Sequence, residues 1–240
     1  MGLNVPATVA YELAVANRIL YDHQIVDGLG HVSQRHPEDP SLFLLSCNRA
    51  PGMVRPEDIT CYRLDGSALD QQAPRPYLER FIHAEIYRAR PDVHAVVHSH
   101  SLSVIPFACV QQPLRPIFHM AGFLGEGSAH FEIREAGGDT DMLISSSYLG
   151  AALAKSLGTR SCVLMRGHGS TVVGADLRQA IFRAVYAETN ARLQLSAQTL
   201  GDPVYLNPKE AQLASDANDG QIARSWNLWM QRLGALDFQP

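Results

Sequence analysis

The stretch that decides the fold runs from Glu79 to His100 and reads ERFIHAEIYRARPDVHAVVHSH. Its first part has apolar side chains spaced for a helix, which Pro91 ends. A short apolar run, Ala95–Val97, then predicts a buried strand that leads into His98 and His100. Because residues two apart on a strand point to the same face, these two imidazoles can bind a single cation.

A metal site of this kind needs a third ligand, and His168 is the best candidate in the chain. It lies in the segment MRGHGS, residues 165–170, between two predicted strands. Pairs of histidines one residue apart also arise by chance in a chain that contains 10 histidines. Spacing alone therefore leaves both metal binding and coincidence open.

Helical and extended segments alternate on both sides of this stretch, which predicts an α/β fold in one domain over residues 1–240. Apolar spacing predicts helices at residues 6–25, 77–90, 148–157 and 177–200, the last capped by Asp176. Short apolar runs predict strands at residues 41–46, 59–64, 94–97, 142–144, 161–165 and 170–173. A helical C-terminal tail is expected from about residue 201.

Composition excludes several classes of function. The 240 residues are 46% hydrophobic and 18% charged, with a formal net charge of -4, so the basic surface typical of nucleic-acid binding is missing. No apolar run approaches the ~20 residues of a membrane span. The first residues do not have the pattern of a signal peptide, so we do not expect one. The four scattered cysteines predict buried, reduced thiols. We expect a cytoplasmic protein that acts on a small molecule, without nucleic-acid or membrane partners.

Two carboxylates could serve a metal site. Glu79 lies in the first turn of the helix predicted at residues 77–90. There it either stabilises the helix start or, close to a cation, acts as a ligand or proton carrier. Glu188 interrupts the apolar stripe of the long helix, where a buried carboxylate needs a partner. It lies at a subunit boundary, extends its carboxylate to water, or orients a ligand histidine without touching the ion.

The run from Glu79 to His100, with Arg166-Gly167-His168-Gly169 and the long helix after it, resembles the signature of the class II aldolase/adducin family. The resemblance covers about residues 10–200. It implies an α/β/α three-layer sandwich around a largely antiparallel sheet, assembled as a homotetramer with active sites at subunit boundaries. It also implies that His98, His100 and His168 bind one divalent metal ion per subunit, while Glu79 is the acid/base. Zinc is the expected ion, with manganese, cobalt or iron as alternatives.

The chain departs from the family's sugar-phosphate aldolases where they bind the phosphate. Their Gly-Asn turn, Ser/Thr-Gly loop and Ser-Ser pair are replaced by Gly30-His31, by the segment SCNR at residues 46–49 and by Tyr77-Leu78. A phosphorylated substrate is therefore not expected. The remaining groups suit a carboxylate or an aromatic ring, although each arginine taken singly is better explained as a solvated surface charge. The candidate substrate-binding residues are His31, Ser46, Arg49, Arg75 and Tyr77.

His119 stands where aldolases that it resembles carry a tyrosine donated to the neighbouring subunit as a proton source. A histidine can serve the same purpose near neutral pH, which makes His119 a second catalytic candidate beside Glu79. The alternative is a packed or surface histidine without a role in the reaction.

Together these features predict a metal-dependent carbon–carbon lyase. A cation held by three imidazoles leaves positions open for two substrate oxygens, and stabilises the negative charge of an enediolate or phenolate intermediate. We expect a decarboxylase of a hydroxylated aromatic or related hydroxy acid, in aromatic compound catabolism. Residues 31–33, interpreted as a turn, the loop at 46–51 and the helix start at 77–79 resemble the family's dihydroxyphthalate-type decarboxylases.

Two other functions remain open at this point. One is an aldolase or retro-aldolase that acts on an unphosphorylated hydroxy-carbonyl substrate. The other is a non-catalytic, adducin-like interaction module. Retention of all three histidines and Glu79 argues against the module, because a scaffold has no need to bring these side chains together.

Overall fold

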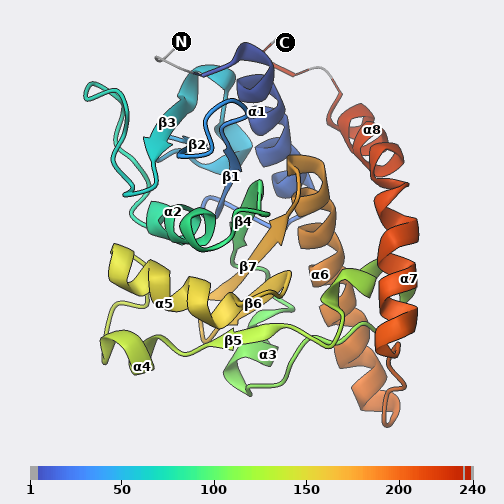
Figure 1. Ribbon diagram of the computed structural model, residues 1–240. Helices are drawn as coiled ribbons and strands as arrows, with labels where there is room; N and C mark the ends of the chain where they lie inside the picture. The colour runs from blue at the N-terminus through green and yellow to red at the C-terminus, as the bar shows by residue number, and fades with distance from the viewer. Residues whose placement is uncertain (1–4, 235, 239–240) are drawn as a thin grey trace.

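A seven-stranded sheet forms the centre of the computed structural model, which describes residues 5–234 and 236–238 (Figure 1). The strand order is β3-β2-β1-β4-β7-β6-β5. Neighbouring strands are antiparallel except for the parallel pair β5 and β6. The strands are β1 (His31–Arg35), β2 (Leu42–Ser46), β3 (Ile59–Arg63), β4 (Ala95–Ser99), β5 (Ala129–Phe131), β6 (Cys162–Met165) and β7 (Gly169–Gly174).

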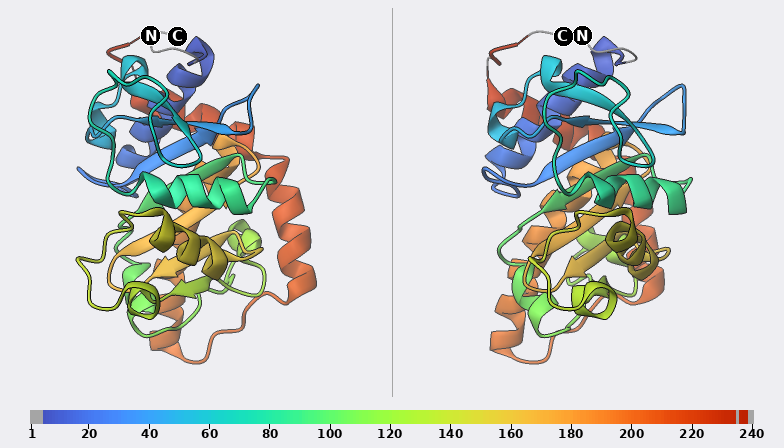
Figure 2. Two further views of the ribbon diagram at one scale, coloured as in Figure 1. Left: turned by 60° about the vertical axis from the view of Figure 1, so that its left-hand side comes forward. Right: turned by 90° about the vertical axis from the view of Figure 1, so that its left-hand side faces the viewer.

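Helices cover both faces of the sheet, with α2 and α5 on one side and α1 and α6 on the other (Figure 2). The α-helices are α1 (Ala7–Asp22), α2 (Arg80–Ala89), α3 (Ile105–Cys109), α4 (Ile133–Gly137), α5 (Ser147–Leu157), α6 (Leu177–Leu200), α7 (Pro208–Asp219) and α8 (Ile222–Leu233). Three short 3-10 helices are η1 (Pro51–Met53), η2 (Pro56–Asp58) and η3 (His119–Leu124). The predicted α/β/α architecture with a largely antiparallel sheet is confirmed.

The apolar core divides into three clusters, and the alternation of side chains along β2 and β4 sends them into two of these. On β4, Val97 packs with α1 and α6, whereas Val96 packs with α2 and α5. Leu44 and Leu45 of β2 divide between the same two clusters in the same way. Polar groups placed on one face of β1 and β4 therefore meet the helix that covers that face, which is the arrangement that builds the site.

Helix and strand boundaries agree closely with the sequence patterns. The Asp176 side chain accepts a hydrogen bond from the Gln179 amide and caps α6, as predicted. The Ser146 side chain caps α5 by accepting from the Leu149 amide. Helices α7 and α8 occupy the tail for which helical structure was expected.

Three local predictions are wrong. Residues 142–144 do not form a strand, because the Ile144 amide donates to the Glu79 carboxylate instead of to a neighbouring strand. Residues 31–33 are not a turn: they begin β1, which lies between β2 and β4 in the middle of the sheet. Cys109, at the end of α3, is exposed, whereas the other three cysteines are buried as expected.

Within residues 5–234 and 236–238, no helix combines the length and the apolar character that crossing a membrane requires.

Candidate active site

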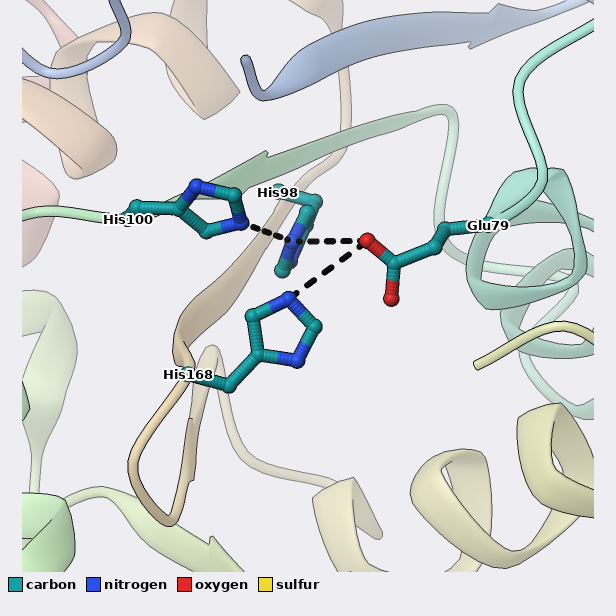
Figure 3. A group of neighbouring side chains, drawn as sticks. All are labelled: Glu79, His98, His100 and His168. Atoms are coloured by element: carbon teal, nitrogen blue, oxygen red, sulfur yellow. Dashed lines mark hydrogen bonds and ion pairs between the residues drawn. The ribbon is translucent and has the colours of Figure 1, made fainter. Parts of the chain in front are cut away.

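Four side chains from separate parts of the chain meet at one end of β4: Glu79, His98, His100 and His168 (Figure 3). One ligand atom of each lies within 4.8 Å of the ligand atoms of the other three. The Nε2 atoms of His98 and His100 are 3.3 Å apart. Oε2 of Glu79 lies 3.4 Å from Nε2 of His168 and 3.6 Å from Nε2 of His98. The structure thus brings the three predicted metal ligands and the predicted acid/base together.

The spacing and chemistry of this cluster fit a divalent metal ion. Nitrogen ligands lie ~2.0–2.1 Å from a tetrahedral zinc ion, which places two such nitrogens roughly 3.3 Å apart. His98 and His100 already have this separation. Three imidazoles and one carboxylate form a donor set that suits zinc and similar transition metals.

The sheet holds the first two histidines in position. His98 lies on β4 opposite Thr171 of β7, and the hydroxyl of Thr171 is 3.4 Å from Nδ1 of His98. A backbone hydrogen bond to Ser170 also involves the His98 ring. Contacts at Nδ1 orient the ring and leave Nε2 directed at the other ligands. His100 follows directly after the end of β4.

His168 lies in the three-residue turn between β6 and β7, where the flanking glycines are required. Gly167 has a φ of 65°, a left-handed conformation that glycine adopts without strain. A Cβ on Gly169 would overlap the carbonyl oxygen of Ser99 on the adjacent strand β4. This close approach of β7 to β4 brings His168 to the end of the strand that carries His98.

Glu79 occupies the N-cap position of α2, but its side chain makes no capping hydrogen bond. Instead, Oε1 accepts a 2.9 Å hydrogen bond from the Ile144 amide, while Oε2 faces the histidines. The carboxylate is buried, with 8% of the residue exposed. Its contacts therefore belong to the cluster and not to the start of the helix.

Protonation states in the cluster favour a bound cation. Burial lowers the pKa of His98 to about 3, and burial followed by the neighbouring His168 lowers the pKa of His100. Burial opposes ionisation of Glu79, but hydrogen bonding by His168 and the electrostatic influence of His98 outweigh it. The pKa of this carboxyl therefore lies well below its usual range. Neutral His98 and His100 rings beside an ionised carboxylate are the protonation states that metal binding requires.

A cavity of about 170 Å³ opens beside the cluster and contains several of the predicted substrate-binding residues. His31, Arg75 and Tyr77 line it together with Glu79 and His100. Arg75 is exposed and has no ion-pair partner among the described residues, so its guanidinium is available to an anion. The remaining lining residues include Leu29, Leu78 and Leu143, which form apolar walls, and Asn48, which was not predicted. A second cavity of about 500 Å³, between residues 21–27 and Leu102, also borders His100.

Ser46 and Arg49, two other predicted substrate-binding residues, do not line the 170 Å³ cavity. Arg49 forms an ion pair with Asp58 at 2.9 Å. The Ser46 hydroxyl donates to the Tyr77 hydroxyl at 3.2 Å, and the Tyr77 hydroxyl donates to the backbone carbonyl of Arg49. Ser46, through its hydroxyl, and Arg49, through its backbone carbonyl, thus hold the Tyr77 hydroxyl in position.

The remaining candidates lie outside the cluster. The Glu188 carboxylate accepts hydrogen bonds from the Ser101 hydroxyl at 2.7 Å and the Ser103 amide at 3.1 Å. It therefore holds the segment that follows His100 and does not contact a ligand histidine. His119 is exposed at the start of η3, where its carbonyl accepts from Asn218. Within the described chain it does not reach the cavity, and a role in a neighbouring subunit's site stays a prediction.

Sequence reasoning missed a buried set of polar groups next to His31. Nδ1 of His31 is 2.6 Å from Nε2 of His83, and Nδ1 of His83 is 2.6 Å from the Ser33 hydroxyl. The Ser33 hydroxyl is in turn 2.7 Å from the Tyr87 hydroxyl. The sequence did contain a signal, because Glu79, His83 and Tyr87 are spaced four apart on one helix face.

The buried histidines predict that the metal-free protein loses stability in acid. His83 and His98 have a pKa of about 3 when folded, against an ordinary value of 6.5. Between these values the unfolded chain binds more protons, so the free energy of unfolding falls as pH drops from 6.5 toward 3. The slope is up to about 1.4 kcal/mol per pH unit for each histidine. Urea unfolding in chelator, at one protein concentration, measures it.

The variant His83→Gln should make this pH dependence shallower, while exposed His94→Gln should leave it unchanged. An identical slope in His83→Gln and the unaltered protein would contradict the assignment of His83 as a neutral buried histidine.

Residues 11–195 match the model of the Class II Aldolase and Adducin N-terminal domain. The chain therefore belongs to the class II aldolase/adducin family. Decarboxylase tropJ of Talaromyces stipitatus is 36% identical and is matched over 96% of each chain. The 3,4-dihydroxyphthalate decarboxylase of Rhodococcus jostii is 33% identical over 79% of this chain and 80% of its own length.

Solved structures of the family share the fold. The L-fuculose 1-phosphate aldolase from Glaciozyma antarctica superimposes with a TM-score of 0.78, at 21% sequence identity. The match covers 95% of this chain and 90% of the aldolase.

Proposed function

We propose that this protein is a divalent-metal-dependent decarboxylase of a hydroxylated aromatic or related hydroxy acid. The observation that carries the proposal is the cluster of Glu79 with three histidines beside a cavity that has apolar walls. Two relatives at 33% and 36% identity are named decarboxylases, which supports this reaction over aldol cleavage.

His98, His100 and His168 would hold the ion, with zinc expected and manganese, cobalt or iron as alternatives. When bound, the ion supplies positive charge that binds two substrate oxygens and stabilises negative charge as the carbon–carbon bond breaks. The hydrogen bond from Ile144 to Glu79 Oε1 leaves Oε2 as the atom that exchanges a proton.

Because Glu79 is ionised before the reaction, it first acts as a base and takes a proton from a substrate hydroxyl. The bond to the carboxylate then breaks, carbon dioxide leaves, and the electron pair of that bond remains on the carbon. Oε2 returns the same proton to this carbon, so the carboxylate is restored. Burial of Glu79 keeps bulk water from supplying or removing the proton.

The cavity suits a planar acid better than a sugar phosphate. Leu29, Leu78 and Leu143 offer apolar surface to a ring, and Arg75 offers a free guanidinium to a carboxylate. The bulky Tyr77 ring, whose centroid is 4.7 Å from that of His31, occupies a place where the resembled aldolases have small hydroxyl donors.

An assay panel tests the substrate class. We expect the metal-loaded protein to release carbon dioxide from ortho-hydroxylated benzoates or phthalates and to leave ketose 1-phosphates intact. Arg75→Ala should raise KM for the acid by about tenfold, a modest effect because this arginine is exposed. The matched control is Arg63→Ala on exposed Arg63 of β3, which should change nothing.

The alternatives give different results in the same panel. Cleavage of hydroxy-carbonyl compounds without decarboxylation would replace the proposal with an aldolase. A protein that binds no metal and acts on neither class would instead be an adducin-like interaction module.

We also propose a cytoplasmic homotetramer with active sites at subunit boundaries. Three large apolar side chains near the site are exposed in the isolated chain: Leu29 at 63%, Leu78 at 49% and Leu102 at 79%. Such groups are typical of surfaces that another subunit covers. Analytical ultracentrifugation should give about four times the chain mass of 26.3 kDa. A monomer at micromolar concentration would contradict the assembly.

A further inference from the structure

The buried polar groups behind His31 form a chain that joins β1 to α2. His31 and Ser33 lie two residues apart on β1, so both side chains point to the same face of the sheet. His83 and Tyr87 lie four residues apart on α2 and face them. The contacts run from Tyr87 through Ser33 and His83 to His31, at 2.7, 2.6 and 2.6 Å.

The hydrogens of this chain can run in only one direction. The side-chain partner of the Tyr87 hydroxyl among the described residues is the Ser33 hydroxyl. The Val96 backbone also hydrogen-bonds the phenol and lowers its pKa, so it acts as a donor to that oxygen. Donation from Ser33 to Tyr87 would leave the phenolic hydrogen buried without an acceptor, which is costly. Tyr87 therefore donates to Ser33.

The rest of the chain follows from this first bond. Ser33 has one hydrogen, which it gives to Nδ1 of His83. His83 and His31 are 0% and 3% exposed, and neither forms an ion pair among the described residues. A charged imidazole buried in this way is costly, so both rings are neutral and each carries a single N–H. His83 then has its hydrogen on Nε2 and donates to Nδ1 of His31. The single hydrogen of His31 is left on Nε2.

Nε2 of His31 has no hydrogen-bond partner among the described residues, and His31 lines the 170 Å³ cavity. The residue is only 3% exposed. It is paired across the strands with the metal-ligand candidate His98, and the two ring centroids are 5.1 Å apart. A substrate in the cavity is thus the partner available to this N–H group.

We propose that Tyr87, Ser33 and His83 are positioning residues that fix His31 as an Nε2–H donor, and that His31 donates to a carboxylate oxygen of the substrate. This inference rests on the proposed function for the identity of the substrate group. It explains why a histidine occupies the position of the family's Gly-Asn turn: a neutral imidazole with a fixed hydrogen selects an acceptor. It also distinguishes His31 from Arg75, which attracts anions through charge from the exposed side of the cavity.

Neutron diffraction from crystals of the zinc-loaded protein tests the tautomers directly. We expect deuterium on Nε2 of both His31 and His83, and on the Tyr87 oxygen along the line to Ser33. Deuterium on Nδ1 of His31 would overturn the proposal. This measurement does not depend on turnover, so a protein that fails to decarboxylate any acid could still show the predicted tautomers.

Ligand binding tests the consequence for recognition. The background is Glu79→Gln, which is expected to slow turnover strongly, and the probes are 2,3-dihydroxybenzoate and catechol, which differ by the carboxylate. His83→Leu removes the donor to His31 and should weaken binding of dihydroxybenzoate by at least tenfold but of catechol by less than twofold. His83→Gln retains an N–H for Nδ1 of His31 and should recover most of the affinity for dihydroxybenzoate that His83→Leu loses. Calorimetry on variants of equal zinc content measures the affinity for each of the two probes.

Equal weakening of the two probes in His83→Leu would show a purely structural role and overturn the proposal. If His83→Leu does not fold, Ser33→Ala removes the hydrogen bond that orients His83 while deleting a single oxygen. It should weaken the binding of dihydroxybenzoate by a smaller factor and again affect catechol less than dihydroxybenzoate. Ser67→Ala, at an exposed turn, is the matched control and should bind both probes normally.

Discussion

Replacing His168 with alanine is expected to remove most of the bound metal and to lower turnover by more than about 100-fold. Even the outer hydrogen-bond partners of metal ligands cause 10- to 100-fold losses, so a ligand itself should cost more. His168 supplies one of three imidazoles, and two imidazoles with a carboxylate hold an ion less well than the full set. Elemental analysis of purified protein measures the occupancy, and carbon dioxide release measures the activity.

The matched control is His94→Ala, because His94 is exposed just before β4 and lies outside the cluster. It should retain metal and activity. His98→Ala and His100→Ala should behave like His168→Ala. Full occupancy in His168→Ala would remove this residue from the metal site and leave His98 and His100 as the histidine ligands.

Glu79→Gln is expected to lower turnover by ~10²–10⁴ while metal remains bound, because glutamine cannot carry the proton between oxygen and carbon. The amide oxygen can still accept from Ile144, so we expect the free energy of unfolding to change by under about 1 kcal/mol. Single-turnover kinetics and urea unfolding on the same preparation measure both quantities.

Glu135→Gln is the control for this substitution, since Glu135 is exposed on α4. It should match the unaltered protein in turnover and metal content. Near-normal turnover in Glu79→Gln would show that Oε2 carries no proton. A loss of metal in the same variant would mean that the carboxylate acts mainly as a fourth ligand.

Local patterns in the sequence predicted most of the secondary structure and the ligands. The helix from residue 80 and the strand from residue 95 follow from apolar spacing, which depends on neighbours in the chain. His98 and His100 were predicted as a pair because residues two apart at the end of a strand point to the same face. The assignment of His168 needed the family resemblance as well, because no local spacing connects residue 168 to residue 98.

The sequence patterns were least informative where a residue's partner lies outside its own segment. Residues 142–144 have the composition of a strand, yet the Ile144 amide contacts Glu79, which is 65 residues away. Arg49 has the chemistry to bind a carboxylate, yet the fold pairs it with Asp58 and keeps it out of the 170 Å³ cavity, so its role in substrate binding stays a prediction. In both cases the sequence of the segment does not indicate the carboxylate that it contacts in the fold.

By itself, the sequence determined the α/β class and predicted the candidate histidine ligands and the glutamate, because these depend on short-range periodicity and on a family motif. Only the tertiary structure decided that β1 passes beside β4 and under α2. That arrangement joins His31 to His83, 52 residues apart, and leaves Arg75 free at the mouth of the cavity. The physical reason is that hydrogen bonds and ion pairs form between groups that the fold brings within about 3 Å, wherever they lie in the chain.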